Sequence, residues 1–236
     1  MLPRPLSKEK PRSRAKLAAD PAHAAGTVLL TGFDAFGGET LNPSWLAVQA
    51  LHGKQVLRHK IVVAQLPTVF DASLQMLRGL LDQHRPGLVI CVGQAGGRPA
   101  LSLERIAINV NDARIPDNAG AQPVDTPVIA GGPAAYFTTL PIKAVVRGLL
   151  GAGIAAEVSQ TAGTFVCNHV FYGLMHLLAT QRGLKETRGG FIHVPFLPEQ
   201  GAPAMPLDEI VLGLKVAVRA ALANTSDVLL GGGAIQ

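Results

Sequence analysis

The stretch Leu88-Val89-Ile90-Cys91-Val92-Gly93 decides the fold class of this 236-residue chain. It is a continuous apolar run, and it leads into the glycine-rich segment Gly93-Gln94-Ala95-Gly96-Gly97-Arg98. An unbroken apolar run of this length, ended by glycine, is typical of a strand buried on both faces, as in a parallel sheet. We therefore expect a central strand at residues 88–93 that delivers a loop to one edge of a sheet.

Strands and helices alternate on both sides of this stretch. Further strands are predicted at residues 28–32, 56–66, 101–110, 155–159 and 190–195. Helices are predicted at residues 43–51, 69–84, 140–150, 165–181 and 206–223, and Asn42 before Pro43 is a good helix start. This alternation predicts one α/β domain with three layers, α/β/α, around a mostly parallel twisted sheet.

Two segments fall outside this alternation. Residues 112–135 are rich in Pro, Gly, Asp and Asn and predict a long loop, and loops of that length are usually functional. The glycine-rich residues 231–233 predict a frayed terminus.

The positive charge of the chain is concentrated at its start. The net charge is +5, but residues 1–26 hold six basic and two acidic residues, a net of +4, which leaves +1 for the rest. This composition predicts a disordered basic tail at 1–26 ahead of a folded domain at 27–236. We therefore expect no nucleic-acid partner. The tail lacks the apolar segment of a secretory signal, and no apolar run approaches the ~18 residues that cross a membrane, so we expect no membrane partner.

The chain has only two cysteines, Cys91 and Cys167, which is no disulfide framework. Hydrophobic residues make up 48% of the chain, enough for a sizeable core. No CxxC pair or clustered His/Cys spacing suggests zinc, so no metal is expected. The simplest interpretation is a reducing cytoplasmic location with both thiols free.

The two cysteines have different predicted surroundings. In open α/β sheets, sites lie beyond the carboxyl ends of the strands, and we expect the loops there to meet at one rim. Cys167 follows a Thr-Ala-Gly-Thr turn and lies two residues into a predicted helix, where free N–H groups lower a thiol pKa and can bind an oxyanion. Cys91 lies inside an apolar strand, where a thiol only packs. Cys167 is therefore the candidate nucleophile.

A thiol nucleophile needs a base, and the base needs an orienting group. His193 lies near the end of a separate predicted strand and can reach the same rim, whereas His169 and His176 share the helix of Cys167 and fit less well. For the orienting carboxylate, spacing alone leaves Glu104, Asp112, Asp117 and Asp125 open. A surface pair between Glu104 and Arg105 is an equally good interpretation of that segment.

Two phenylalanines, Phe33 and Phe36, stand three apart in a glycine-rich loop, although aromatic residues are only 5% of the chain. They form either a hydrophobic plug under the loop or an apolar wall for a flat ligand. The Gly93–Gly97 stretch has neither the P-loop Lys-Ser/Thr nor the spacing of a dinucleotide fingerprint, so a phosphate cradle there is a weak alternative.

At these residues the chain resembles the pyroglutamyl peptidase I family, also called pyrrolidone-carboxylate peptidase. Four segments, in an order and spacing that fit across about residues 27–222, carry the resemblance. They are Thr31-Gly32-Phe33-Asp34-Ala35-Phe36-Gly37-Gly38 with Asn42-Pro43-Ser44; Gly93-Gln94-Ala95-Gly96-Gly97-Arg98 through Glu104-Arg105-Ile106-Ala107-Ile108-Asn109 to Asp112-Ala113-Arg114-Ile115-Pro116-Asp117; Ser159-Gln160-Thr161-Ala162-Gly163-Thr164-Phe165-Val166-Cys167-Asn168; and Phe191-Ile192-His193-Val194-Pro195.

The resemblance implies a Cys-His-Glu triad, which falls here on Cys167, His193 and Glu104. It also implies a single α/β domain that assembles as a tetramer and uses no metal or cofactor. Ala35 departs from the family, because many relatives carry proline there, and the basic tail has no counterpart in the short family members.

The implied activity is removal of an N-terminal pyroglutamyl (5-oxoproline) residue from peptides through a thioester. By the same resemblance, Arg114 helps to stabilise the oxyanion. Phe33, Phe36, Phe165 and Val166 would enclose the lactam ring, and Gln94 would meet its polar atoms. Two other functions stay open at this point: a nucleic-acid-binding protein that uses the tail, and a non-catalytic nucleotide-binding α/β module that uses the Gly93–Gly97 loop.

Overall fold

A seven-stranded sheet lies at the centre of the computed structural model, which describes residues 26–233. Its strands are β1 (Thr27–Phe33), β2 (Gln55–Val56), β3 (His59–Leu66), β4 (Leu88–Gln94), β5 (Leu101–Glu104), β8 (Ala156–Ser159) and β9 (Arg188–Val194), in the order β2-β3-β1-β4-β9-β5-β8. Four of its six strand pairings are parallel, and the antiparallel ones are β2–β3 and β5–β9. The predicted mostly parallel sheet is confirmed.

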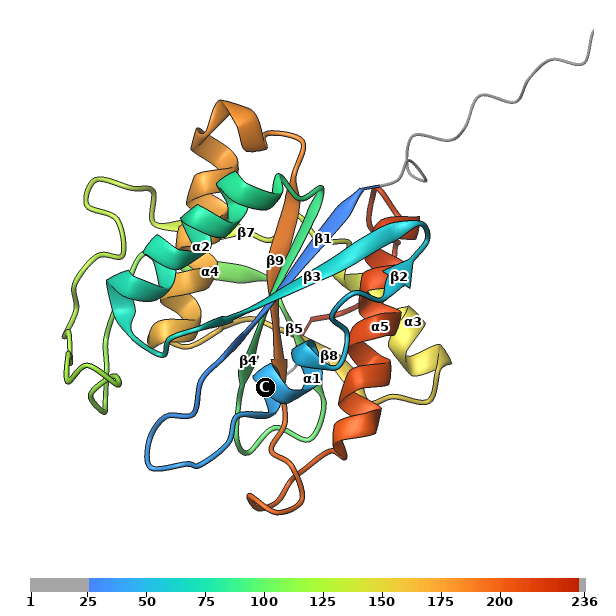
Figure 1. The fold of residues 1–236 in the computed structure, drawn as a ribbon, viewed down its shortest axis with the longest axis horizontal. Helices are drawn as coiled ribbons and strands as arrows, with labels where there is room; N and C mark the ends of the chain where they lie inside the picture. The colour runs from blue at the N-terminus through green and yellow to red at the C-terminus, as the bar shows by residue number, and fades with distance from the viewer. Residues whose placement is uncertain (1–25, 234–236) are drawn as a thin grey trace, which may run out of the picture.

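Five α-helices cover the two faces of this sheet. They are α1 (Pro43–Gln49), α2 (Phe70–His84), α3 (Ile142–Gly151), α4 (Val166–Thr180) and α5 (Leu207–Ala223), and a short 3₁₀ helix, η2 (Arg182–Leu184), follows α4. Helices α2 and α4 lie on one face, and α1, α3 and α5 lie on the other (Figure 1). The three-layer α/β/α prediction is therefore confirmed, and each predicted helix is present within two residues of its expected ends.

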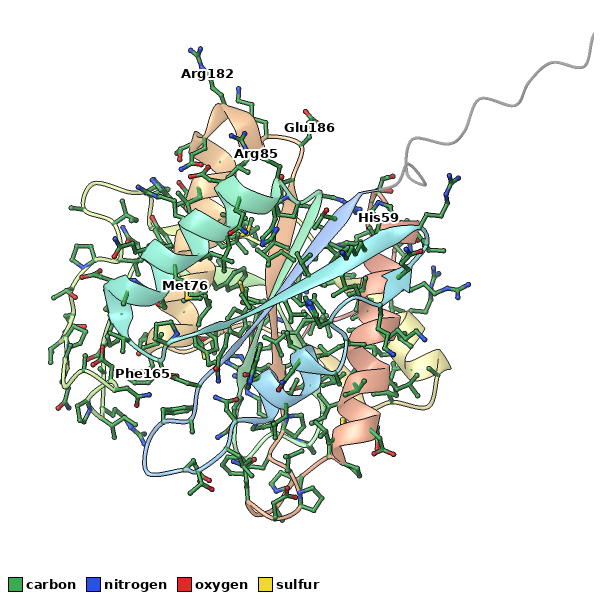
Figure 2. The ribbon with its side chains drawn as sticks, in the orientation of Figure 1. His59, Met76, Arg85, Phe165, Arg182 and Glu186 are labelled. Atoms are coloured by element: carbon green, nitrogen blue, oxygen red, sulfur yellow. The ribbon has the colours of Figure 1, made fainter. Side chains whose placement is uncertain are left out.

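Alternation along the strands builds the two cores. In β1, Val28 and Leu30 face the cluster shared with α1, α3 and α5, whereas Leu29 and Phe33 face the cluster shared with α2 and α4. Side chains fill the space on both sides of the sheet (Figure 2). Because successive strand residues point to opposite faces, a continuous apolar run supplies both cores at once.

The loop after β1 is locked onto the start of α1. Asn42 caps the helix by accepting a hydrogen bond from the Ser44 N–H at 3.0 Å, as predicted, and Ser44 Oγ accepts one from the Phe33 N–H at 3.0 Å. A Cβ atom on Gly32 would come within 2.6 Å of Trp45 Cα, so only glycine fits where the strand passes this helix.

The predicted strand at residues 56–66 is instead a hairpin. Strands β2 and β3 pair antiparallel through a two-residue turn at Leu57 and Arg58, whose φ angles are 45° and 67°. Both central residues of a type I′ turn have positive φ, and glycine and asparagine are the usual occupants. Neither occurs here, so no turn residue marks the point where the chain reverses.

The predicted strand at residues 101–110 is divided between two sheets. Strand β5 belongs to the large sheet, and β6 (Ile106–Ile108) pairs antiparallel with β7 (Ala135–Phe137) in a separate two-stranded sheet. Between them, residues 112–134 form the expected long loop, held at its base by a bridge between Asn111 and Thr126. The loop therefore ends one residue earlier than predicted, at a strand that the sequence interpretation missed.

Strand β8 does not run with β1, β4 and β9. It is parallel to β5, and β5 is antiparallel to β9, so the carboxyl end of β8 points away from the rim where the other three end. We expected every site loop to follow the carboxyl end of a strand at this rim, and for β8 that expectation is wrong. The segment that follows β8 reaches the rim by turning back into α4.

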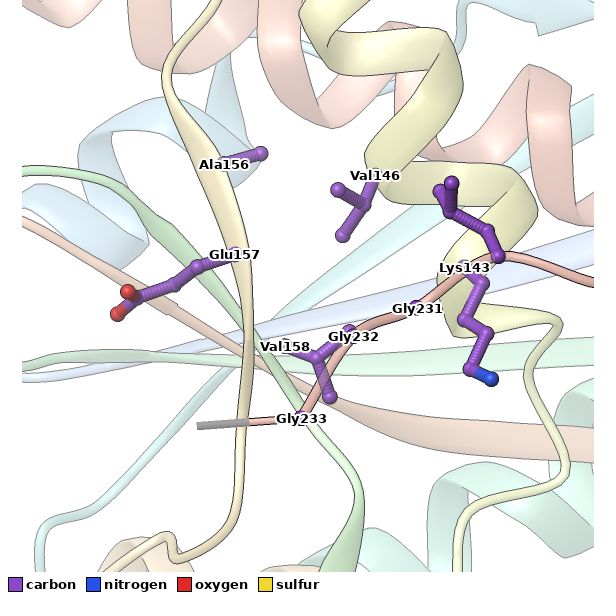
Figure 3. A pocket seen from close by; sticks show the side chains of 9 residues that line it. Lys143, Val146, Ala156, Glu157, Val158, Gly231, Gly232 and Gly233 are labelled. Carbon is purple, nitrogen blue, oxygen red and sulfur yellow. The ribbon is translucent and has the colours of Figure 1, made fainter. Parts of the chain in front are cut away.

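The glycine-rich end of the chain is not frayed in the way its composition suggested. Gly232 O accepts a hydrogen bond from Arg105 Nη2 at 3.2 Å, and Asp227 accepts hydrogen bonds from the N–H groups of Lys143 and Ala144 at the start of α3. Residues 231–233 run between α3 and β8 and line a cavity there with Lys143 and Glu157 (Figure 3). The Gly232 carbonyl and the Asp227 carboxylate therefore hold this part of the chain.

The predicted tail, residues 1–26, lies almost wholly outside the described residues. Within residues 26–233, no helix is both long enough and apolar enough to cross a membrane.

Candidate active site

A buried carboxylate and an imidazole meet on the face of the sheet covered by α4. Strand β5 pairs with β9 so that Ser102 lies opposite His193, and Glu104, two residues along, shares their face. Glu104 Oε1 lies 2.8 Å from His193 Nδ1, and the two side chains are 0% and 4% exposed. An imidazole that donates from Nδ1 keeps its Nε2 lone pair free to accept a proton.

Cys167, the second residue of α4, lies beside this pair. In the β4–β9 register Gly93 is the partner of His193, and paired residues point to the same face. A Cβ atom built on Gly93 would stand 2.8 Å from Cys167 Sγ and 2.8 Å from Phe191 Cζ. The thiol therefore lies over Gly93, one strand away from His193, in space that only a glycine leaves free.

The start of α4 offers unpaired N–H groups next to the thiol. Phe165 is the N-cap residue, and no side chain makes a capping hydrogen bond there. First-turn N–H groups of a helix have no partner within the helix, so they can bind a developing oxyanion beside Cys167.

The electrostatics of Cys167 differ from the expectation. Burial raises the pKa of the thiol to about 12, the Glu104 carboxylate also raises it, and Arg98 lowers it. The helix start was expected to give a lowered pKa, and that expectation is wrong because the loss of solvation outweighs it. Burial therefore favours the neutral thiol over the thiolate, so a base is needed to take its proton during an attack.

The other cysteine and histidines lie elsewhere. Cys91 is fully buried in β4, where burial raises its pKa to about 12, with the neighbouring Thr31 hydroxyl acting in the opposite direction. His169 is buried on another side of α4, with Nδ1 3.0 Å from Asn111 Oδ1, and burial lowers its pKa. His176 Nδ1 lies 3.0 Å from Tyr136 Oη. Of the three candidate histidines, His193 is the one whose strand partner, Gly93, lies under the Cys167 thiol.

The competing carboxylates have other positions. Asp117 is buried, but it accepts hydrogen bonds from the N–H groups of Phe70, Ala119 and Ala121 and so holds the long loop to α2. Asp112 and Asp125 are exposed. A surface pair of Glu104 with Arg105 does not form either, because Glu104 is buried and Arg105 bonds Gly232.

The predicted pocket residues divide into side chains that are at least partly exposed and side chains that are buried. The rings of Phe36 and Phe165 are 6.0 Å apart, and a cavity of about 260 Å³ beside Phe165 is lined by Asp112, Arg114, Ile115, Thr164 and Phe165. Phe165 lies near the loop that follows β1 (Figure 2). Phe33 is only 2% exposed and packs on Phe191, and Val166 is fully buried, so neither side chain has an open surface in this structure.

Gln94 ends β4 at the same rim, and its neighbour was not expected. Gln94 Oε1 accepts a hydrogen bond from Gln200 Nε2 at 3.2 Å, and the same Nε2 lies 3.3 Å from Glu39 Oε2. Nothing in the spacing of the motifs pointed to Gln200, because it comes from the loop after β9.

The Gly93–Gly97 loop is shaped for close packing. Gly93 lies under the thiol and under Phe191, and a Cβ atom on Gly96 would collide with the Phe196 ring. Side chains occupy the space beside Gly93 and Gly96, so close packing accounts for these glycines without a bound phosphate. Within residues 26–233 no group of three or more His, Cys, Asp or Glu side chains is arranged to hold a metal ion.

Arg98 is a neighbour of the site that sequence reasoning quoted but did not assign. Its Nη1 lies 2.7 Å from Glu104 Oε1. The signal that could have found it is the requirement that a buried carboxylate be paired, applied to the only arginine between Gly93 and Glu104.

Comparison with known proteins supports one family over the whole folded part. A model of the pyroglutamyl peptidase family matches residues 26–224. The chain is 58% identical to the pyrrolidone-carboxylate peptidase of Cupriavidus necator, over 89% of this chain and 99% of that protein, and 54% identical to that of Bacillus cytotoxicus, over 88% and 98%. Among solved structures, the crystal structure of pyroglutamyl peptidase I from Bacillus amyloliquefaciens matches with a TM-score of 0.86 at 52% identity, over 88% of this chain and 100% of that one. A mutant pyrrolidone carboxyl peptidase from Pyrococcus furiosus matches with a TM-score of 0.80 at 41% identity, over 84% and 98%.

Proposed function

This chain belongs to the pyroglutamyl peptidase family and is a cysteine peptidase of the pyroglutamyl-peptidase I type, and we propose that Cys167, His193 and Glu104 carry its reaction. The observation that supports this most is the placement of the thiol over Gly93, whose strand partner is the imidazole that Glu104 holds at 2.8 Å. Cys167 is the nucleophile, His193 the general base and acid, and Glu104 the group that orients His193.

Acylation begins with a neutral thiol. Since burial raises the Cys167 pKa to about 12, His193 Nε2 removes the proton as Sγ attacks the carbonyl carbon of the first peptide bond. The Cys167 N–H and Arg114 stabilise the oxyanion, and one such donor is typically worth ~3 kcal/mol. The carbon–nitrogen bond breaks, and the imidazolium gives its proton to the leaving amine.

Deacylation repeats the proton transfers with water. His193 accepts a proton from a water molecule that attacks the thioester, and the carbon–sulfur bond breaks. The products are 5-oxoproline and the free thiol, with the proton returned to sulfur from His193. Glu104 stabilises the imidazolium in both halves of the reaction, which is the role of the carboxylate in triads of this kind.

The substrate is a neutral five-membered lactam with apolar edges, one N–H and one C=O. Phe36 and Phe165, 6.0 Å apart, form the apolar wall, and the buried Phe33 and Val166 form the floor. Gln94, held by Gln200, pairs with the lactam polar atoms. A site built to pair such atoms rejects a proline ring by about 10⁴-fold, because proline would leave them unpaired.

The wider setting is part of the same proposal. We infer a cytoplasmic enzyme in which both thiols stay reduced, because Cys91 and Cys167 are free and the nucleophile requires a thiol. Residues 27–236 form one catalytic domain that works without metal or cofactor and assembles as a tetramer. Its partners are small pyroglutamyl peptides and not nucleic acid or membrane.

The deciding experiment compares two fluorogenic amides, one pyroglutamyl and one prolyl, with the full reduced chain. We expect rapid hydrolysis of the pyroglutamyl amide and at least about 10⁴-fold slower hydrolysis of the prolyl amide. Folded, reduced protein that hydrolyses neither amide, or both equally, would overturn the proposed function.

A further inference from the structure

The Glu104 carboxylate is buried and bears two hydrogen bonds on one oxygen. Its side chain has no exposed surface, and Oε1 accepts from His193 Nδ1 at 2.8 Å and from Arg98 Nη1 at 2.7 Å. Within the described residues, Oε2 has no hydrogen-bond partner. A charge in the interior is costly unless an opposite charge compensates it. Among residues 26–233, Arg98 is the only cation in ion-pair contact with this carboxylate, apart from His193 when protonated.

The same guanidinium holds the chain that leads to the nucleophile. Arg98 Nη1 lies 3.3 Å from Ser159 Oγ, and Nη2 donates to Thr161 O at 3.0 Å. Thr161 comes six residues before Cys167, between the end of β8 and the start of α4. Because β8 runs away from the rim, this segment must turn back, and Arg98 fastens it at the turn.

The conformation of the loop after β4 directs the Arg98 side chain toward Glu104 and the segment that follows β8. Gly97 has a φ of 83°, a left-handed conformation that favours glycine, and Gly96 lies flat against the Phe196 ring. The chain reverses within four residues, with the Arg98 N–H bonded to Ala95 O at 3.4 Å. Arg98 keeps 27% of its side chain exposed while its guanidinium reaches the buried carboxylate.

We propose that Arg98 is a positioning residue of the active site, which holds the Glu104 carboxylate against His193 and fixes the Ser159–Thr161 segment ahead of Cys167. It acts through Glu104 and makes no contact with the substrate. The proposal rests on the proposed function, since it assigns Arg98 to the triad described above.

The charges around His193 give this role a distinctive signature. Three titratable or charged groups lie near the imidazole: Glu104 from β5, Arg98 from the loop after β4 and Cys167 from α4. Two others are more remote. Cys91 of β4 raises the pKa of Cys167, and Glu157 of β8 accepts a hydrogen bond from Ser102 Oγ. The Arg98 charge offsets part of the attraction of Glu104 for a protonated imidazole. Without Arg98, the protonated form of His193 persists to higher pH, so the acidic limb of kcat/KM moves upward by roughly one pH unit.

Removal of Glu104 has the opposite sign. In Glu104→Gln the imidazolium loses its anionic partner, so the acidic limb moves to lower pH. A residue that merely supports the fold would change the rate or the thermal stability but would leave the limb in place. Opposite limb shifts from two partners of one ion pair therefore separate a positioning role from a structural one.

The experiment measures kcat/KM against pH for the pyroglutamyl amide in wild type, Arg98→Gln, Arg98→Lys and the matched control Arg105→Gln, whose native guanidinium bonds Gly232 O instead. We expect Arg98→Gln to lose about 10- to 100-fold in kcat and to show the upward limb shift, because charge and fork are both lost. Arg98→Lys keeps the charge, so its limb stays near that of wild type. Arg105→Gln keeps the rate within about twofold of wild type and leaves the acidic limb at its wild-type pH.

A second variant keeps the test decisive if Arg98→Gln fails to fold. The double variant Arg98→Gln/Glu104→Gln removes both charges and leaves no buried anion unpaired. If Arg98 acts through Glu104, the double variant has the rate of Glu104→Gln alone, because the effects of two residues that act as a unit are not additive. Independent losses that multiply in the double variant, or an unmoved limb in a folded Arg98→Gln, would overturn the proposal. Wild type that fails to hydrolyse the amide would overturn the proposed function instead.

Discussion

The two cysteines of this chain both have a raised thiol pKa, but they differ in exposure and in the groups that surround the sulfur. Burial raises the pKa of both Cys91 and Cys167 to about 12. Cys91 is fully buried in the middle of β4. Cys167 is partly exposed at the start of α4, over the glycine that pairs with His193.

This difference teaches that the thiol pKa alone does not identify a nucleophile in a buried site. What separates Cys167 from Cys91 is access for a substrate, a base within one strand of the sulfur, and the unpaired N–H groups of a helix start. Cys167 does not need a lowered pKa, because His193 can accept the thiol proton while the sulfur attacks.

The largest expected effect is the loss of the nucleophile. Cys167→Ala or Cys167→Ser lowers turnover of the pyroglutamyl amide by about 10⁴-fold or more, because no other group can form the thioester. The matched variant Cys91→Ser retains most of its activity. Steady-state rates of the three variants at equal folded concentration check this, and activity that follows Cys91 instead would put the site in the wrong place.

The next effect concerns Glu104, the carboxylate that lies near Cys167 and holds its base. Glu104→Gln lowers kcat by roughly 100- to 1,000-fold, less than the loss of Cys167, because the nucleophile and oxyanion donors remain. The acidic limb of the profile moves to lower pH, and the fold survives because glutamine still forms hydrogen bonds. Glu104→Ala is harsher, since it leaves a hole and an imidazole N–H without a partner.

Arg105→Ala serves as the control for Glu104, since the two residues are adjacent and Arg105 bonds Gly232 O. We expect near-normal turnover from it. A Glu104→Gln enzyme with wild-type rate and an unmoved profile would remove Glu104 from the triad and leave His193 without its partner.

A smaller effect tests the raised pKa directly. In a Cys91→Ser background, the rate of alkylation of Cys167 by iodoacetamide should rise with pH from 7 to beyond 9 without a plateau, because the thiolate fraction grows up to the pKa of about 12. Quantitative mass spectrometry of the Cys167 peptide provides the rate. A plateau below pH 8 would show a preformed thiolate–imidazolium pair and contradict the protonated resting thiol.

The smallest effect is expected far from both cysteines. Deletion of residues 1–25 should leave turnover of a small amide within about twofold, because the first core strand begins at Thr27. Kinetics of the truncated chain, with circular dichroism to verify folding, measure this. A large loss in a folded truncation would mean that the tail contributes to the site or to assembly.

Local patterns were sufficient for the parts of this fold that depend on neighbouring residues. The five helices follow from apolar periodicity and from caps such as Asn42, and the buried strands follow from runs such as residues 88–93. The positions of Cys167 at a helix start and His193 near a strand end could also be predicted, because both are local features.

Features set by contacts between distant segments could not be read in this way. The turn at Leu57 and Arg58 lacks turn residues, and the direction of β8 is fixed by its pairing with β5 rather than by its own four residues. Glu104 was one of four candidate carboxylates until family resemblance selected it. Arg98 becomes visible only when the carboxylate it compensates is known to be buried.

The most direct test of the account is to find where a substrate-like electrophile reacts. A pyroglutamyl chloromethyl ketone carries the lactam into the pocket and alkylates the nucleophile, and peptide mapping then identifies the modified residue. The account predicts stoichiometric modification of Cys167 with full loss of activity, slowed by added 5-oxoproline and strongly slowed in a folded His193→Ala variant. Modification of Cys91, or inactivation with Cys167 unmodified, would contradict it.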